Sequence, residues 1–236
     1  MTTKIATFDD YKATIQQSVT EVVTAAPELA KTCYLSGTMP VTVIDQPFAM
    51  SIDMDWRTKK THQSPSGIVK TLADTLGDRF EVEEADREFG IYRAIIRPAK
   101  KGGVLMSLDL FSSFEPAKTL RTFPVTGVSA ESFADYLANK VACLTERMEV
   151  KDLFHLCALT KNPKTARDTW DAIGDGIGAD ELAERIIMAK DDLSSIKSLF
   201  APPPGFSAPT KADFSAWLGD VSQKIADGDI CSNCMR

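Results

Sequence analysis

The chain has 236 residues, of which 44% are apolar and 25% charged, and its formal net charge is −6. This length and apolar content predict a folded protein with one large or two small hydrophobic cores. The acidic balance argues against binding of nucleic acid through a broad basic surface, because that binding depends on clustered Lys and Arg, so any contact with RNA must be local.

The sequence carries no signal for export, membrane insertion or a disulfide framework. No positively charged start is followed by a short apolar stretch, and no apolar run approaches the roughly 20 residues of a membrane-spanning helix. An odd number of cysteines suits reduced thiols. We therefore expect a cytoplasmic protein without a membrane partner. The cysteines are Cys33, Cys143, Cys157, Cys231 and Cys234.

The first predicted element is a helix. Residues 7–10 have the pattern of a capping box, apolar residues then recur at helical spacing, and Pro27 ends the helix. The sequence leaves the structure of residues 39–44 open, because a proline and several β-branched residues fit a helix poorly. Residues 68–76 predict a short helix that Gly77 ends.

Three carboxylates lie within runs that predict β-strands. Asp53 and Asp55 alternate with apolar residues over 52–56, so an extended strand would direct both carboxylates to one face and the apolar side chains to the core. Asp109 lies in the apolar run 103–111, which predicts a buried strand. Carboxylates held on rigid strands are oxygen ligands of the kind that Mg²⁺ prefers. Further β-rich runs are residues 80–84 and 90–96.

A Ser-Gly turn precedes the acidic pair. Ser36 and Gly37 follow the apolar residues 33–35, and a turn of this kind exposes backbone N–H groups that a phosphate can approach closely. Neither the turn nor the acidic pair identifies a function by itself. Together they favour a site that holds both a metal ion and a phosphate group.

From Ser129 onward the composition predicts helices. The apolar stripe of residues 133–144 includes Lys140, although lysine is almost never buried without a partner. If residues 145–148 turn the chain, Lys140 and Asp152 would face each other across a helix hairpin. Further helices are predicted at residues 164–173, 181–190 and 193–200. A proline-rich linker at residues 201–209 cannot continue a helix. A last helix is predicted after it, which residues 210–213 cap and Gly228 ends.

These features resemble the nucleotidyltransferase superfamily. The turn, the acidic pair and the third acid follow its order, while residues 136–144, Arg147 and residues 151–156 resemble the helical signature of the AbiEii/AbiGii toxin family. The resemblance covers residues 35–159. It implies an α/β fold, with a nucleotidyltransferase-type mixed sheet flanked by helices and a helical C-terminal half. The implied domains are a nucleotidyltransferase α/β domain at residues 1–127 and a helical domain at residues 128–236.

The resemblance also implies an enzyme. It would be a Mg²⁺-dependent nucleotidyltransferase that transfers a nucleotide from a nucleoside triphosphate to RNA and releases pyrophosphate. Characterised branches of the family modify the 3′ end of tRNA and act as toxins of toxin–antitoxin or phage-defence systems, so an antitoxin is the implied protein partner. The implied metal ligands are Asp53, Asp55 and Asp109; Ser36, Gly37 and Lys140 would bind the nucleotide; and Lys140 and Asp152 would join the three carboxylates in catalysis. Basic residues that would guide RNA are Lys59, Lys60, Arg93, Arg97, Lys100, Lys101, Lys118 and Arg121.

Two other functions stay open: the order of Asp53 and Asp55 after an apolar strand also suits a phosphohydrolase, and three departures from the family pattern suit a binding module. Ser36 replaces the first glycine of the family's usual Gly-Gly turn, Met50 stands where a basic residue is common, and His155 replaces a second helical acid. One alternative is therefore a binding module that has the nucleotidyltransferase fold but impaired catalysis. The other is a phosphohydrolase in which Asp53 is the nucleophile, although Arg57 stands where that class has Thr or Val.

Overall fold

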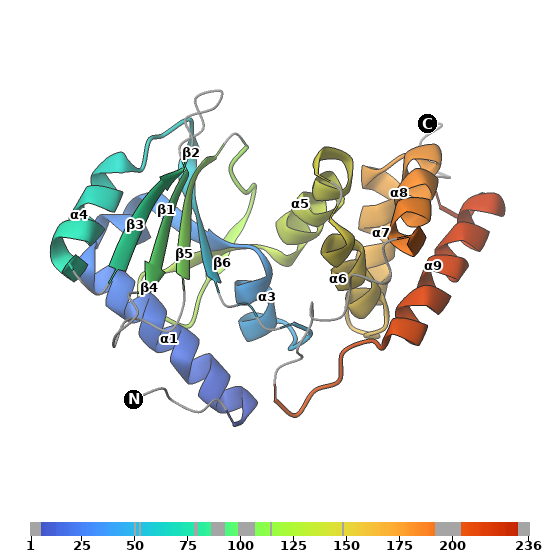
Figure 1. Ribbon diagram of the computed structural model, residues 1–236, viewed down its shortest axis with the longest axis horizontal. Helices are drawn as coiled ribbons and strands as arrows, with labels where there is room; N and C mark the ends of the chain where they lie inside the picture. The colour runs from blue at the N-terminus through green and yellow to red at the C-terminus, as the bar shows by residue number, and fades with distance from the viewer. Residues whose placement is uncertain are drawn as a thin grey trace. The chain divides into compact units, whose positions relative to one another are not determined.

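The structure is a computed structural model that describes residues 6–49, 51, 53–77, 80–85, 93–98, 107–113, 115–147, 149–191 and 204–230. The chain divides into two compact units, which we describe separately. The first unit comprises Met1–Phe133 with Pro203–Gly205, and the second comprises Ala134–Pro202 with Phe206–Arg236. The first unit combines helices with a sheet, and the described part of the second is helical (Figure 1).

The first unit is built on one mixed β-sheet. Its strands lie in the order β3-β4-β5-β2-β1-β7-β6. β2 runs parallel to β5 and β1 runs parallel to β7, while the other neighbouring strands are antiparallel. The mixed sheet expected from the sequence is therefore present. The strands are β1 (Cys33–Ser36), β2 (Asp53–Thr61), β3 (Phe80–Ala85), β4 (Arg93–Pro98), β5 (Ser107–Ser113), β6 (Leu120–Thr122) and β7 (Ser129–Glu131).

The helices of the first unit are α1 (Phe8–Ala25), α2 (Glu28–Thr32), α3 (Thr38–Ile44) and α4 (Ser66–Leu76). α1 begins with the predicted capping box, in which the side chains of Thr7 and Asp10 each accept a hydrogen bond from the other's backbone N–H. The segment that the sequence left open is α3. Its Pro40 lies in the first turn, where the missing N–H has no intrahelical partner to lose.

The hydrophobic core lies between these helices and one face of the sheet. Met54 and Trp56 from β2 are fully buried, and they belong to the same apolar cluster as Ile15 of α1 and Leu72 of α4. The neighbouring strands add further apolar side chains to this face. Because strand side chains alternate, the residues between them, including Asp55, must lie on the opposite face. The other members contributed by the central strands are Cys33, Leu35, Leu108, Leu110 and Ala130.

The second unit packs five described helices. An aromatic stack joins three of them, with Trp217 of α9 stacked on Trp170 of α7 and Phe214 packed edge-on against Phe154 of α6. The predicted helix at 193–200 lies outside the described residues. Within the described parts of the chain, no helix combines the length and apolar character needed to span a membrane. The five helices are α5 (Phe133–Glu146), α6 (Val150–Thr160), α7 (Ala166–Gly176), α8 (Ala179–Asp191) and α9 (Lys211–Ala226).

The close approach of α7 to α5 gives a test of this packing. A Cβ on Gly176 would lie 2.7 Å from Cγ1 of Val141, whereas a Cβ on Gly174 would meet no atom within 4 Å. We expect Gly176→Ala to lower the free energy of unfolding by about 1–2 kcal/mol through overpacking. Gly174→Ala should instead raise it by about 0.5–1 kcal/mol through helix propensity. Chemical denaturation measures both values, and equal effects of the two substitutions would contradict this packing.

Candidate active site

The register of the sheet brings the predicted acidic residues onto one face. Asp55 in β2 lies directly opposite Asp109 in the parallel strand β5, and Asp53 lies opposite Ser107. Asp53 and Asp55 are half-buried, while Met54 and Trp56 between them have no exposed surface. The alternation predicted for this strand is thus confirmed.

The donor set of this face suits a hard divalent cation. Neighbouring strands lie about 4.8 Å apart, and two carboxylates side by side at that spacing destabilise a sheet unless positive charge or hydrogen-bond donors offset them. Asp109 is 8% exposed, so its carboxylate is largely withdrawn from water. Among the residues that the structure describes, no three His, Cys, Asp or Glu side chains have converged on a single point. The carboxylate oxygens of Asp53, Asp55 and Asp109 are the ligand type for Mg²⁺.

The Ser-Gly turn lies against the same row of residues. Ser36, the last residue of β1, is opposite Asp55, and Gly37 follows with a φ of 79°. A Cβ on Gly37 would come closer to Oδ2 of Asp55 than real Cβ atoms approach an oxygen. Glycine is therefore required here both for its left-handed backbone and for the space that the Asp55 carboxylate occupies.

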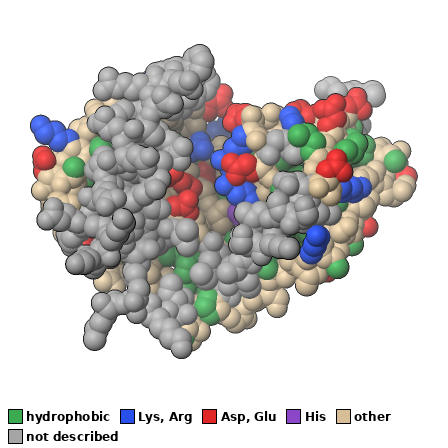
Figure 2. All heavy atoms as spheres, viewed as in Figure 1, with side chains coloured by type: hydrophobic (Ala, Val, Ile, Leu, Met, Phe, Trp, Pro, Cys, Tyr) green, Lys and Arg blue, Asp and Glu red, His purple; other side chains and the backbone are tan. Residues whose placement is uncertain are grey.

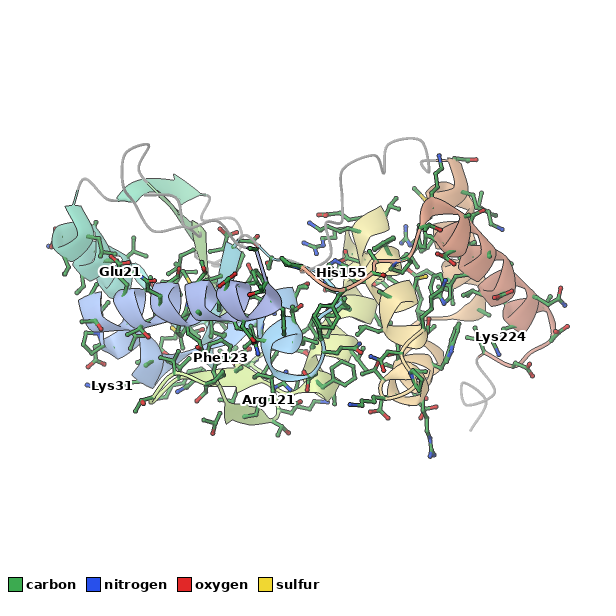
Figure 3. The ribbon with its side chains drawn as sticks, turned by 90° about the horizontal axis from the view of Figure 1, so that it is seen from below. Glu21, Lys31, Arg121, Phe123, His155 and Lys224 are labelled. Atoms are coloured by element: carbon green, nitrogen blue, oxygen red, sulfur yellow. The ribbon has the colours of Figure 1, made fainter. Side chains whose placement is uncertain are left out.

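A buried acid that the sequence analysis did not identify holds this turn. Glu131 in β7 has no exposed surface, and its Oε1 accepts a hydrogen bond of 2.6 Å from the N–H of Gly37. The N–H that was predicted to meet a phosphate thus has a carboxylate partner in this structure. Arg121, which is labelled in Figure 3, donates to the backbone oxygen of Glu131 and pairs with Asp45. Glu131 stands at the end of a three-residue strand, which has no periodicity that a sequence pattern could detect.

A hydrogen-bond network also reaches Asp53. The hydroxyl of Ser51 donates to Oδ1 of Asp53 at 2.6 Å, and the backbone of Ser51 is bonded to the hydroxyl of Tyr11 in α1. Burial, with a smaller contribution from the negative charge of Asp53, raises the pKa of Tyr11 to about 12. The Tyr11 hydroxyl therefore keeps its proton at neutral pH. Neither Tyr11 nor Ser51 was among the site residues predicted from the sequence.

The second unit contains the predicted lysine–aspartate pair. Nζ of Lys140 in α5 lies 2.7 Å from Oδ1 of Asp152 in α6, and both side chains are buried. The prediction that these two residues face each other across a helix hairpin is confirmed. Arg147, from the turn between the helices, also approaches Asp152 at 3.3 Å. Figure 2 shows basic and acidic side chains gathered beside a histidine on the visible face.

His155 lies one turn beyond Asp152 in α6 (Figure 3). Burial, followed by the positive charges of Lys140, Lys151 and Arg147, lowers the pKa of His155 well below 6.5. The imidazole is therefore neutral at pH 7. The stability that this residue contributes is present above pH 6.5 and is lost as the pH falls below that value, because the unfolded chain then binds the extra proton.

The charges around this pair leave a positive excess. Lys140, Arg147 and Lys151 are cationic, while Glu149 and Asp152 are anionic, and these five groups are joined by ion pairs. Three positive and two negative charges leave a net charge of +1. A second acid in place of His155 would cancel it, so the departure at His155 makes this cluster better suited to an anion.

The predicted site residues therefore fall into two groups. Asp53, Asp55, Asp109, Ser36 and Gly37 share one face of the sheet in the first unit, and Lys140 and Asp152 form a pair in the second. Joint action of the two groups on one nucleotide stays a prediction. Met50, where the sequence lacks the basic residue of the family, lies outside the described residues.

No protein-family model matches the sequence, and no curated protein is significantly similar to it. Solved structures do match. A protein from H. pylori assigned as a nucleotidyltransferase superimposes with a TM-score of 0.50 at 16% identity, and the match covers 89% of this chain and 97% of that chain. JHP933 from Helicobacter pylori gives a TM-score of 0.49 at 15% identity, with 90% and 95% covered. MenT4, a nucleotidyltransferase toxin from Mycobacterium tuberculosis H37Rv, gives 0.48 at 12% identity, with 92% and 85% covered.

The first of these matches extends over most of both chains, so it bears on the architecture as a whole. At 16% identity this match bears on the fold alone. The chain therefore has the nucleotidyltransferase fold, with the mixed sheet and the helical C-terminal half that its sequence predicted.

Proposed function

We propose that the protein is a Mg²⁺-dependent nucleotidyltransferase that transfers a nucleotide from a nucleoside triphosphate to RNA. One observation carries this proposal: Asp55 and Asp109 lie side by side in register, on the face of the sheet that also bears Asp53 and the Gly37 turn. A nucleoside triphosphate brings several negative charges to such a face. These charges are tolerable beside carboxylates only when divalent cations neutralise them.

Asp53, Asp55 and Asp109 would hold the cations. Bound Mg²⁺ would supply neutralisation of the phosphate charges and activation of the attacking hydroxyl. In the transfer step, the hydroxyl oxygen of the acceptor forms a bond to the α-phosphorus while the bond to the bridging oxygen breaks. Pyrophosphate leaves, and Asp109 takes the hydroxyl proton. Asp109 is 8% exposed and lies in register with Asp55, so its carboxylate belongs to the same acidic row.

Ser36 and Gly37 would position the triphosphate. Since the N–H of Gly37 already donates to Glu131, a phosphate oxygen could take that donor only by displacing the buried carboxylate. We therefore assign the phosphate contact to the hydroxyl of Ser36. Gly37 would serve by leaving room for Asp55. Ser36, which stands where the family it resembles has the first glycine of the turn, would thus bind a phosphate oxygen through its hydroxyl.

Lys140 would neutralise charge that develops on the departing pyrophosphate, and Asp152 would orient Lys140 through the 2.7 Å ion pair. The net positive charge of the cluster supports this role. If the acidic residues neutralised the cluster completely, no net positive charge would remain to attract a phosphate. A neutral His155 adds no charge to the cluster.

The acceptor we propose is the 3′ end of tRNA, and the biological role is that of a toxin held in check by an antitoxin. Several of the basic residues expected to guide RNA make contacts within the chain. Lys59 donates to the backbone oxygen of Ala30, and Arg121 pairs with Asp45. Lys60 and Lys118 are exposed. Lys100 and Lys101, and the side chains of Arg93 and Arg97, lie outside the described residues.

Transfer from labelled nucleotides tests the proposal. The protein is incubated with each labelled triphosphate, Mg²⁺ and total RNA, and label in RNA is measured. We expect Asp53→Asn to lower transfer by more than about 100-fold, because even loss of a group that merely orients a metal ligand costs 10–100-fold. Glu28→Gln, which removes an exposed acid paired with Lys31, is the control and should retain activity.

Other outcomes of the same experiment favour the alternative functions. Binding of the Mg²⁺-triphosphate by the wild type without turnover would indicate a binding module. A covalent phosphate on Asp53, detected by mass spectrometry, would indicate a phosphohydrolase. Absence of transfer from every triphosphate to RNA would count against the enzyme that we propose.

Gly37→Ala tests the role of the turn. The substitution should lower the free energy of unfolding by about 1–2 kcal/mol because of the positive φ, and it should also reduce transfer strongly because the new Cβ displaces the Asp55 carboxylate. Gly127→Ala is a matched control, since Gly127 has a φ of 78° but a Cβ there would meet no atom within 4 Å. Equal losses of activity in the two variants would show that backbone strain alone is responsible.

Lys140→Met tests the lysine while keeping its volume similar. It should lower the free energy of unfolding by about 3 kcal/mol, because removing one partner of a buried ion pair leaves Asp152 with only the longer contact to Arg147. Lys161→Met is the control, since Lys161 pairs with Asp213 at the surface and its loss should cost no more than about 1 kcal/mol. Transfer is measured at a temperature where circular dichroism shows both variants folded. We expect loss only in Lys140→Met; full activity of that folded variant would remove Lys140 from the mechanism.

A further inference from the structure

Tyr11 binds the chain immediately ahead of β2. Its hydroxyl accepts a hydrogen bond from the N–H of Ser51 at 2.8 Å and donates to the carbonyl oxygen of the same residue at 3.1 Å. Tyr11 lies in α1 and is 2% exposed. Both backbone groups of Ser51 are thus satisfied by one side chain from a helix that is distant in sequence. Tyr11 therefore fixes both the N–H and the carbonyl oxygen of Ser51.

Ser51 in turn holds the carboxylate of Asp53. Its hydroxyl donates to Oδ1 of Asp53 at 2.6 Å and lies 3.2 Å from the backbone oxygen of Asp53. A bond this short to an ionised acceptor is of the strong, charge-assisted kind. Because Oδ1 accepts this hydrogen bond, the carboxylate is oriented to offer its other oxygen to a cation. Tyr11, Ser51 and Asp53 therefore form one connected chain from α1 to the acidic face.

The place of Asp53 in its strand explains why it needs this support. Asp53 is the first residue of β2, whereas Asp55 and Asp109 lie inside strands with paired residues on either side. A carboxylate at a strand end has more rotamers available, and a cation that selects one of them must offset the lost side-chain entropy. An orienting hydrogen bond removes part of that cost before the cation arrives.

We propose that Tyr11 and Ser51 are positioning residues that orient the Asp53 carboxylate for the divalent cation. This inference rests on the proposed function, because it assigns Asp53 to a cation site. It extends that function by giving α1, whose residues Ile15, Val19 and Val22 belong to the hydrophobic core, a part in the site as well.

Cation binding without turnover tests the proposal. Mn²⁺ is the probe, since it shares the oxygen ligands of Mg²⁺ and its free concentration can be followed by electron paramagnetic resonance. Ser51→Ala removes the hydroxyl that binds Asp53, and Tyr11→Phe removes the hydroxyl that fixes Ser51. Each should weaken Mn²⁺ binding about tenfold, the lower end of the effect found for groups that orient metal ligands.

Three further variants separate positioning from general stability. Ser51→Thr keeps the hydroxyl and should restore Mn²⁺ affinity to within about twofold of the wild type. Tyr34→Phe deletes an equally buried tyrosine hydroxyl that accepts from the N–H of Ala117, and it should leave the affinity unchanged. The double variant Tyr11→Phe/Ser51→Ala should bind no more weakly than Ser51→Ala alone, because both changes act through one carboxylate.

Each result has a definite meaning. Mn²⁺ affinities of Ser51→Ala and Tyr11→Phe equal to that of the wild type overturn the positioning role but leave the proposed function intact. If Tyr34→Phe also weakens Mn²⁺ binding, loosened packing explains the effect and the positioning role is overturned. The same holds if the double variant loses affinity by the product of the two single losses. If the wild type binds Mn²⁺ but transfers no nucleotide, the proposed function fails while the affinities still decide the positioning role. A wild type that binds no Mn²⁺ rejects both.

Discussion

The alternation of side chains along β2 is the constraint on which the rest of the site depends. Met54 and Trp56 are fully buried in the apolar cluster to which α1 and α4 also contribute, and this burial fixes which face of the strand points away from the core. A shift of register by one residue would expose two large apolar side chains and bury Asp53 and Asp55 without partners. The hydrophobic core thus determines where the carboxylates lie.

The carboxylate face is held from several sides by residues that the chain brings from far apart. Asp109 comes from the parallel neighbour β5, Glu131 of β7 binds the Gly37 turn, and Tyr11 of α1 secures Ser51 ahead of Asp53. Buried polar groups of this kind are stable only when each has a partner, so the supporting bonds also specify the backbone. A glycine is needed next to Asp55 for another reason, because the Asp55 carboxylate occupies the space that a Cβ would fill.

The helical unit contains a buried ion pair between Lys140 and Asp152. Burying Lys140 and Asp152 costs desolvation energy, which their ion pair and the approach of Arg147 offset. Replacing this pair by apolar residues would often be neutral or stabilising, so its presence inside a hairpin is a reason to look for a function. The neutral His155 leaves a net positive charge in the cluster, which is a property that a purely structural ion pair does not need.

Local patterns in the sequence determined most of the elements and part of the site. Period-two alternation predicted the face of Asp53 and Asp55, the capping boxes predicted the starts of α1 and α9, and equal spacing from a turn predicted that Lys140 meets Asp152. The sequence left α3 open because a proline in the first turn of a helix and a proline inside one look alike without knowledge of where the helix begins. It predicted helix from Ser129, whereas residues 129–131 form β7 and α5 begins at Phe133. Only the tertiary structure decided that Glu131 binds the Gly37 turn and that Tyr11 reaches Ser51. These contacts join residues distant along the chain, and their partners are set by sheet order and helix packing, which no local periodicity encodes.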